Sequence, residues 1–131
     1  MCIKSNINKL SIAKKRDMNN TSSQFLTIND KATSESLKLD FLRLKKSAMI
    51  LRALNHKLRQ QLVRLIDEHQ KITVTEIYVS LRLEQSVVSQ HLAILRRANI
   101  VITKREGKFI FYSLNYARIQ EINSFVEQLV S

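Results

Sequence analysis

The chain has 131 residues, of which 44% are hydrophobic, 6% aromatic and 25% charged, and its formal net charge is +11. This length suits one ordinary domain, and a chain with one glycine and no proline lacks the turn residues that a β-sandwich or barrel needs. The composition therefore indicates helices, and the charge favours a polyanionic partner such as nucleic acid or an anionic membrane surface.

The cysteine content and the hydropathy of the chain narrow its class further. The lone cysteine, Cys2, excludes an internal disulfide and a zinc site built from several cysteines. The first residues, MCIKSNINKLSIAKKRD, lack the apolar core of a secretory signal, and no run approaches the roughly 20 apolar residues of a membrane span. We therefore expect a soluble, cytoplasmic protein with no membrane partner.

Residues 1–33 differ in composition from the rest of the chain. They are rich in Ser, Asn, Thr and Lys, carry six basic against two acidic residues, and show no sustained hydrophobic period. This composition predicts a flexible basic tail, and residues 34–131 are the expected folded domain. A solvated leader and a source of extra phosphate contacts are both compatible with such a tail.

A helix is predicted from about Ser36 to Ala53, with Ser34 or Ser36 as its cap. Its apolar residues repeat at spacings of three and four, at Leu37, Phe41, Leu44, Ala48 and Leu51. Further apolar residues such as Leu42 and Met49 widen this face beyond what one core requires. A helix that is apolar on two sides favours packing against a second copy of the chain. Beyond Asn55-His56, a second helix follows with Leu58, Leu62, Leu65 and Ile66.

The next segment predicts a helix-turn-helix. Thr73 and Glu76 have the spacing of a capping box, which places a brief helix from about Val74 to Leu81. The connection that follows, Arg82-Leu83-Glu84, is only three residues long. Two helices joined by so short a turn are typical of a helix-turn-helix unit.

The second helix of this unit contains the stretch SVVSQHLAILRRANIV. On a helical wheel its apolar side is formed by Val88, Leu92 and Leu95, with Ile94 at the margin. The outward side carries no acidic residue and consists of Gln85, Ser86, Ser89, Gln90, Ala93, Arg96 and Arg97. Asn99 tolerates left-handed backbone geometry and is expected to end the helix.

A β-hairpin and a last helix complete the prediction. VITK and FIFYSL are β-rich runs, and the only glycine of the chain, Gly107, lies in the turn between them. The expected hairpin tip is basic, with Lys104, Arg105 and Lys108. The C-terminal helix, from about Tyr116 to Val130, has an apolar stripe at Ile119, Ile122, Phe125, Val126 and Leu129.

These elements predict a DNA-binding surface. Short polar side chains near the N-terminus of a recognition helix reach base edges in the major groove, and a basic hairpin reaches the backbone or the minor groove. The expected DNA contacts are Gln85, Ser86, Ser89, Gln90, Arg96, Arg97, Lys104, Arg105 and Lys108. Three alternatives stay open: a merely solvated helix face, a winged helix that binds protein, and one that binds RNA.

Residues 51–114 resemble the ArsR/SmtB family of dimeric winged-helix repressors in bacteria. The resemblance rests on Leu54-Asn55-His56 with Arg59, on SVVSQHL followed by LR and ANIV, and on KREGK with Phe111-Tyr112. It implies a winged helix-turn-helix fold, mainly α with a small β-hairpin, in a homodimer. The implied function is repression from an imperfect palindrome in double-stranded DNA, in the bacterial cytosol and associated with the nucleoid.

The dimer is expected to form through the helices at about 36–53 and 116–130. The interface residues that we expect are Leu37, Phe41, Leu44, Ile119, Ile122, Phe125 and Leu129.

The departures from the family pattern concern the inducing signal. Many members bind metals through two cysteines in the helix before the recognition helix, where this chain has Tyr78 and Ser80. The C-terminal helix contains no histidine, so the zinc site of other members is not expected either. We therefore predict no metal and no cofactor, and leave open an unknown effector or protein partner. The sequence has no Gly-rich phosphate loop, no nucleophile in a recognisable setting and no converging pair of carboxylates, so we expect no enzymatic activity.

The three histidines are given structural roles. His91 is expected at the edge of the core, bonded to a backbone group. His56 is expected to cap or break a helix junction, and His69 to end a helix where its charge suits the dipole.

Overall fold

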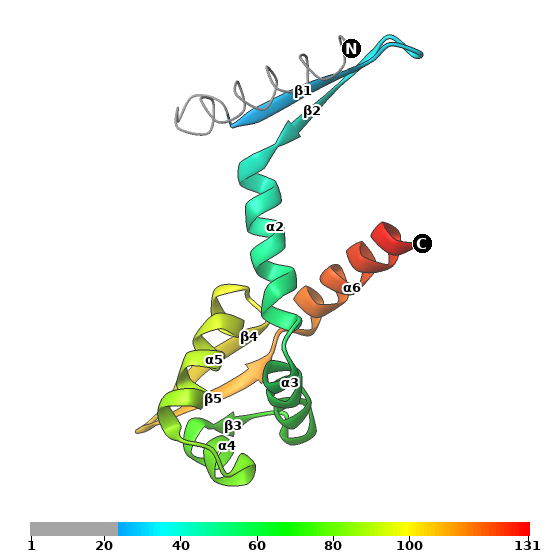
Figure 1. Ribbon diagram of the computed structural model, residues 1–131. Helices are drawn as coiled ribbons and strands as arrows, with labels where there is room; N and C mark the ends of the chain where they lie inside the picture. Colours follow the sequence, from blue (N-terminus) through cyan, green and yellow to red (C-terminus); the bar gives the residue numbers. More distant parts are fainter. Residues whose placement is uncertain (1–23) are drawn as a thin grey trace. The chain divides into compact units, whose positions relative to one another are not determined.

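The computed structural model describes residues 24–131, which divide into two compact units between Ser47 and Ala48. The described part of the first unit holds a β-hairpin and the start of a helix, and the second unit holds the remaining helices and a three-stranded sheet (Figure 1).

The first unit contains β1 (Phe25–Asp30) and β2 (Glu35–Asp40), which pair antiparallel with Ile28 opposite Leu37. Because neighbouring residues of a strand point to opposite faces, this register places apolar side chains on one face of the hairpin. Those residues are Leu26, Ile28, Leu37 and Leu39. Helix α2 (Phe41–Leu54) follows without a loop, and the Asp40 carboxylate accepts from the backbone N–H of Leu42 at 2.9 Å.

The predicted helix start near Ser36 is wrong, because the chain is extended through Asp40 and turns helical only at Phe41. The segment ESLKLD alternates polar and apolar residues, which is the period of a strand, and Asp40 supplies the helix cap. The predicted tail boundary at residue 33 falls in the turn between the two strands, so the last part of that predicted tail is a strand. Residues 1–23 lie outside the described part of the chain.

The second unit follows the predicted order of elements. After α2 come α3 (Lys57–His69), β3 (Ile72–Thr73), α4 (Val74–Leu81) and α5 (Gln85–Arg97). The chain then forms β4 (Val101–Glu106), β5 (Phe109–Leu114) and α6 (Tyr116–Val130). The sheet has the order β3-β5-β4, with Val101 opposite Leu114 and Ile72 opposite Tyr112. This confirms a mainly α winged helix-turn-helix.

Local signals set the element boundaries of this unit. The capping box of Thr73 and Glu76 is formed in both directions, and the same hydrogen bonds hold the pKa of Glu76 below its usual value. Arg82 ends α4 in the left-handed conformation, and Asn99 after α5 has a φ of 60°, as predicted. Gly107 has a φ of 62° at the wing turn, the backbone state for which glycine is preferred.

The core of the second unit lies where α3, α4 and α5 pack on the sheet (Figure 1). The predicted inner face of α5 is confirmed, since Val88, Leu92 and Leu95 are at most 1% exposed. Ile77 of α4 is also fully buried. Among the helices of residues 24–131, none has the length and apolar character of a membrane span.

Candidate nucleic-acid interface

The outer face of α5 is exposed and free of acidic side chains. Its N-terminal half presents two amides and two hydroxyls, on Gln85, Ser86, Ser89 and Gln90, and all four residues are exposed. Because the opposite face is locked in the core, rotation about the helix axis cannot turn these groups inward. The helix thus holds short hydrogen-bonding side chains at a fixed orientation, which is what reading base edges requires.

The turn before α5 fixes how the helix leaves the body of the unit. The backbone N–H of Leu83 donates to Tyr78 O at 3.1 Å, and that of Arg82 donates to Val79 O at 3.3 Å. These two bonds satisfy carbonyl groups at the C-terminus of α4. They hold the three-residue connection against the end of α4, and this fixes where α5 begins.

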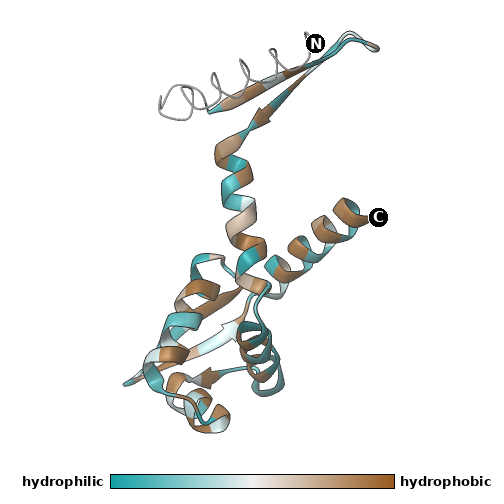
Figure 2. Cartoon of the chain, in the orientation of Figure 1, coloured by the Kyte–Doolittle hydropathy of each residue, from teal (hydrophilic) through white to brown (hydrophobic). Residues whose placement is uncertain are grey.

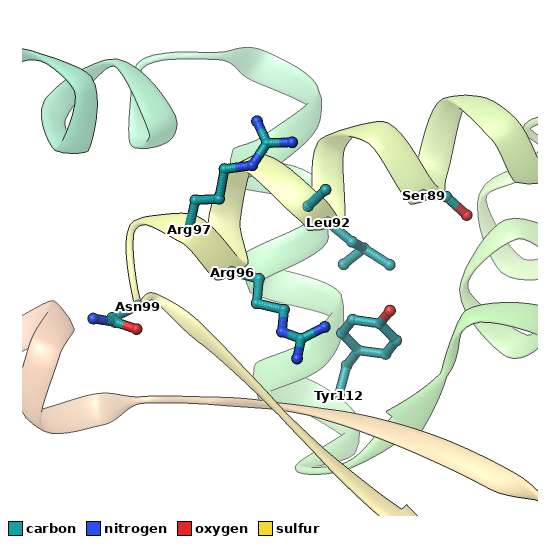
Figure 3. A pocket seen from close by; sticks show the side chains of 7 residues that line it. Ser89, Leu92, Arg96, Arg97, Asn99 and Tyr112 are labelled. Carbon is teal, nitrogen blue, oxygen red and sulfur yellow. The ribbon is translucent and has the colours of Figure 1, made fainter.

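The C-terminal half of α5 borders a pocket of about 500 Å³. Arg96 of α5 and Tyr112 of β5 point toward one another across this pocket, whereas Arg97 points away from Tyr112 (Figure 3). The complete lining is Ser89, Leu92, Ala93, Arg96, Arg97, Asn99 and Tyr112. Neither arginine forms an ion pair within residues 24–131, so both charges remain available to an anion.

Tyr112 was not among the residues predicted to contact DNA. It lies opposite Thr103 in the sheet and two residues before the buried Leu114, so its side chain shares the inner face of β5. Period-two counting back from Leu114 would have placed it on the side of α5.

The β4–β5 hairpin presents the predicted basic tip. Lys104, Arg105 and Lys108 are all exposed, and the Arg105 guanidinium donates to Gly107 O at 3.2 Å. Glu106 is the acidic residue of this tip, and Lys71 pairs with it at 2.8 Å, which holds the pKa of the Glu106 carboxyl below its usual value. Lys71 therefore compensates the local negative charge and leaves the tip cationic.

The histidines partly follow their predicted roles. The Nδ1 atom of His56 accepts from the backbone N–H of Leu58 at 3.1 Å and caps α3, and His69 is the last residue of that helix. His91 lies at the edge of the core as expected, but the predicted bond to a backbone group is wrong. Its Nδ1 lies 3.2 Å from the guanidinium of Arg59, because α3 brings this buried arginine beneath α5.

Tyr78 and Ser80, the two positions compared above with metal-binding cysteines, lie on α4. Tyr78 is half-buried against the core and Ser80 is exposed. Within residues 24–131, no group of three or more His, Cys, Asp or Glu side chains has the geometry to hold a metal ion. Cys2 lies outside this range.

The predicted dimerisation residues occupy three elements. Leu37 lies on β2 instead of a helix and is 65% exposed, while Phe41 and Leu44 lie in the first turns of α2 and are exposed. On α6, Ile122 is buried within its own chain and Ile119 is half-buried. Phe125 and Leu129 remain 47% and 65% exposed, and the alternating colours of α6 reflect this amphipathic pattern (Figure 2).

The same architecture occurs in bacterial regulators. The sequence model of the bacterial regulatory protein arsR family matches residues 56–103, which span α3, α4, α5 and the start of β4. The transcriptional repressor PagR of Bacillus anthracis is 33% identical over 85 residues, which cover 65% of this chain and 85% of PagR. The transcriptional activator HlyU of Vibrio cholerae is 31% identical over 84 residues, covering 64% of this chain and 77% of HlyU.

Solved structures of the same two relatives share the fold. The crystal structure of PagR superposes with a TM-score of 0.53 at 30% identity, covering 69% of this chain and 99% of PagR. HlyU from Vibrio cholerae also gives a TM-score of 0.53 at 30% identity, covering 67% of this chain and 95% of HlyU. The family match at residues 56–103 includes the helix-turn-helix that presents the polar face of α5.

Proposed function

The chain belongs to the ArsR family of bacterial DNA-binding transcriptional regulators, and from this premise we propose that it is a homodimeric repressor of an imperfect palindrome in double-stranded DNA. The observation that carries the proposal is the division of α5 into two chemical halves. Its exposed N-terminal half has uncharged hydrogen-bonding groups, and its C-terminal half has two arginines without ion-pair partners in the described residues.

This division suits a helix that lies in the major groove. Amide side chains such as those of Gln85 and Gln90 form paired hydrogen bonds with adenine, and the hydroxyls of Ser86 and Ser89 accept or donate at several base edges. Arg96 and Arg97 would neutralise phosphates, and the wing residues Lys104, Arg105 and Lys108 would extend the cationic surface to the neighbouring backbone.

The exposed apolar side chains support a two-fold dimer. Phe125 and Leu129 of α6, together with Leu37, Phe41 and Leu44, expose apolar surface that a second copy of the chain would cover. Two recognition helices related by a two-fold axis would enter successive major grooves about one helical turn apart, roughly 34 Å. The operator should therefore consist of two inverted half-sites.

Repression follows from occupancy of such a site by the dimer in the bacterial cytosol. PagR is named a repressor and HlyU an activator, so the direction of regulation needs its own measurement. A promoter fusion to a reporter gene, assayed with and without the protein, should show lower expression when the protein is present. Higher expression would keep the DNA-binding activity and reverse the proposed direction.

The test of DNA recognition starts from selection of bound fragments in genomic DNA. The selected duplex, a shuffled duplex, the corresponding single strands and a structured RNA should then be compared in gel shifts at one salt concentration, because electrostatic affinity changes with salt. We expect the selected duplex to bind at least roughly 1,000 times more tightly than the shuffled duplex. Equal binding of RNA and duplex DNA would contradict the proposal.

A further inference from the structure

Arg59 of α3 is the one buried charged residue within residues 24–131, with 6% of its surface exposed. Its guanidinium has no carboxylate partner in that range. Its Nε donates to Ala53 O at 2.6 Å, and its Nη2 donates to Arg52 O at 2.8 Å. The remaining contact is between its Nη1 and Nδ1 of His91 on α5, at 3.2 Å.

The two carbonyl groups explain how a buried cation is tolerated here. Arg52 and Ala53 lie in the last turn of α2, where carbonyl oxygens lack partners inside the helix and carry the negative end of the helix dipole. The guanidinium satisfies two of these oxygens and offsets part of its own desolvation. Arg59 therefore joins three helices, because it belongs to α3, binds the end of α2 and contacts α5.

The contact with α5 requires one particular state of His91. A guanidinium has only donors, so Nδ1 of His91 must accept, and the ring must be neutral with its proton on Nε2. The other titratable group beside the ring is His56, whose ring centroid lies 4.8 Å away. Burial, His56 and Arg59 together hold the pKa of His91 below its ordinary value of 6.5.

We propose that Arg59 is a positioning residue for the recognition helix and that it holds α5 through the neutral ring of His91, so that protonation of His91 loosens α5 and weakens operator discrimination. The proposal rests on the proposed function, because it concerns the helix assigned to reading bases. Protonated His91 would present an N–H donor and a positive charge to the donors of Arg59. The hydrogen bond would become a repulsive contact, which would displace α5 relative to α3 although its inner face stays in the core.

The direction of the pH effect follows from this geometry. Because the folded protein disfavours protonated His91, the contribution of the Arg59 contact is complete above the ordinary value of 6.5. It is lost as the pH falls from there through the lowered pKa of His91. This direction is opposite to that of a simple charge effect, since added protons make the protein more cationic and should tighten binding to any DNA.

The test measures affinity for the selected duplex and for the shuffled duplex between pH 7.5 and 5.5, with circular dichroism confirming that the protein stays folded. The ratio of the two affinities should fall several-fold as the pH is lowered, while affinity for the shuffled duplex does not fall. A ratio that stays constant over this range would overturn the proposal. Absence of discrimination already at pH 7.5 would instead contradict the proposed function.

Two variants separate His91 from the other titratable groups. His91→Asn places an amide oxygen close to the position of Nδ1, so it keeps an acceptor for Arg59 and removes the titration. The ratio should then be independent of pH. His69→Asn removes a histidine at the far end of α3, and its ratio should fall as in the wild type. An equal fall in His91→Asn and the wild type would overturn the proposal.

A measurement on the wild-type protein tests the role of His91 even if His91→Asn fails to fold. The pKa of each histidine can be followed by NMR in the free protein and in the complex with the selected duplex. If neutral His91 supports the reading conformation, operator binding must lower its pKa further, by reciprocity of linked equilibria. An unchanged or raised pKa of His91 in the complex would overturn the proposal.

Discussion

Helices α5 and α6 have the same kind of sequence pattern and very different surfaces. Each has apolar residues at spacings of three and four, and each is amphipathic. On α5 this apolar stripe is fully buried by other elements of the same chain, since Val88, Leu92 and Leu95 are at most 1% exposed. On α6 the apolar stripe is only partly buried, since Phe125 and Leu129 are 47% and 65% exposed.

The anchoring of the two helices differs in the same way. α5 packs against α3, α4 and β4, and Arg59 of α3 contacts it at His91. α6 is tied near its start, where Tyr116 donates to the Asp67 carboxylate at 2.6 Å and Arg118 donates to Ala98 O at 3.2 Å. An apolar stripe can therefore serve two purposes. A fully buried stripe, as on α5, fixes the orientation of the opposite face, and a partly exposed stripe, as on α6, is available to pack against another chain.

The largest expected effect is the loss of stability when a side chain in the buried stripe of α5 is shortened. Leu92→Ala removes a fully buried side chain between α5 and the sheet, so we expect the free energy of unfolding to fall by about 2–5 kcal/mol. Urea denaturation at fixed protein concentration measures it. Val130→Ala, at a 77% exposed position of α6 that is not among the proposed dimer residues, is the control and should have a smaller effect. If both variants lose the same stability, the buried stripe of α5 does not stabilise the chain as described.

A charge placed in the partly exposed stripe of α6 should disrupt dimerisation. Phe125→Asp places a charge on the proposed dimer surface, and we expect dissociation to monomers with a loss of about 2 kcal/mol or more in operator binding. Sedimentation at micromolar concentration should give twice the chain mass for the wild type and the single chain mass for the variant. Ser124→Asp adds the same charge beside the stripe and should remain dimeric. A wild-type monomer that still binds operator would contradict this assignment.

The outer face of α5 should control specificity. Gln90→Ala and Ser86→Ala each remove a group proposed to contact base edges, so discrimination between operator and random duplex should fall by about 1–3 kcal/mol per good contact. Binding to random duplex should change little. Gln61→Ala, at an exposed position on α3, is the control and should retain full discrimination. Unchanged discrimination in both α5 variants would mean that another element reads the bases.

The smallest effect is expected at the wing, outside both stripes. Arg105→Gln or Lys108→Gln should weaken binding to all duplexes alike and reduce the slope of log affinity against log salt by roughly 0.9 per lost phosphate contact. Gel shifts over a range of salt concentrations measure the slope. Arg64→Gln, an exposed cation on α3, should leave it unchanged. A change in sequence preference without a change in slope would point to base contacts by the wing instead.

The C-terminal two thirds of the chain could be predicted well because its signals are local. The capping box of Thr73 and Glu76, the turn at Gly107 and the helix end at Asn99 each depend on residues a few positions apart. The β1–β2 hairpin was missed because β2 leads directly into α2. There, Leu37 satisfies a helical spacing with Phe41 and a strand period with Leu39, so the local pattern alone does not distinguish a strand from a helix.

The candidate DNA-binding site could also be predicted only in part from the sequence. The sequence alone determined which face of α5 is polar, because a helical period and a set of buried aliphatic residues leave one side outward. It did not show that Tyr112 faces Arg96, since that depends on the position of β5 in the sheet.

The sequence by itself thus determined the order of the helix-turn-helix and wing, their caps and turns, and the chemistry of the outward face. Only the tertiary structure decided that Arg59 meets His91, 32 positions away, and that the stripe of α6 stays open. The physical reason is that caps, turns and periods arise within a few residues of chain. A contact between distant residues, and the burial of a face, depend instead on how whole elements pack around a shared core.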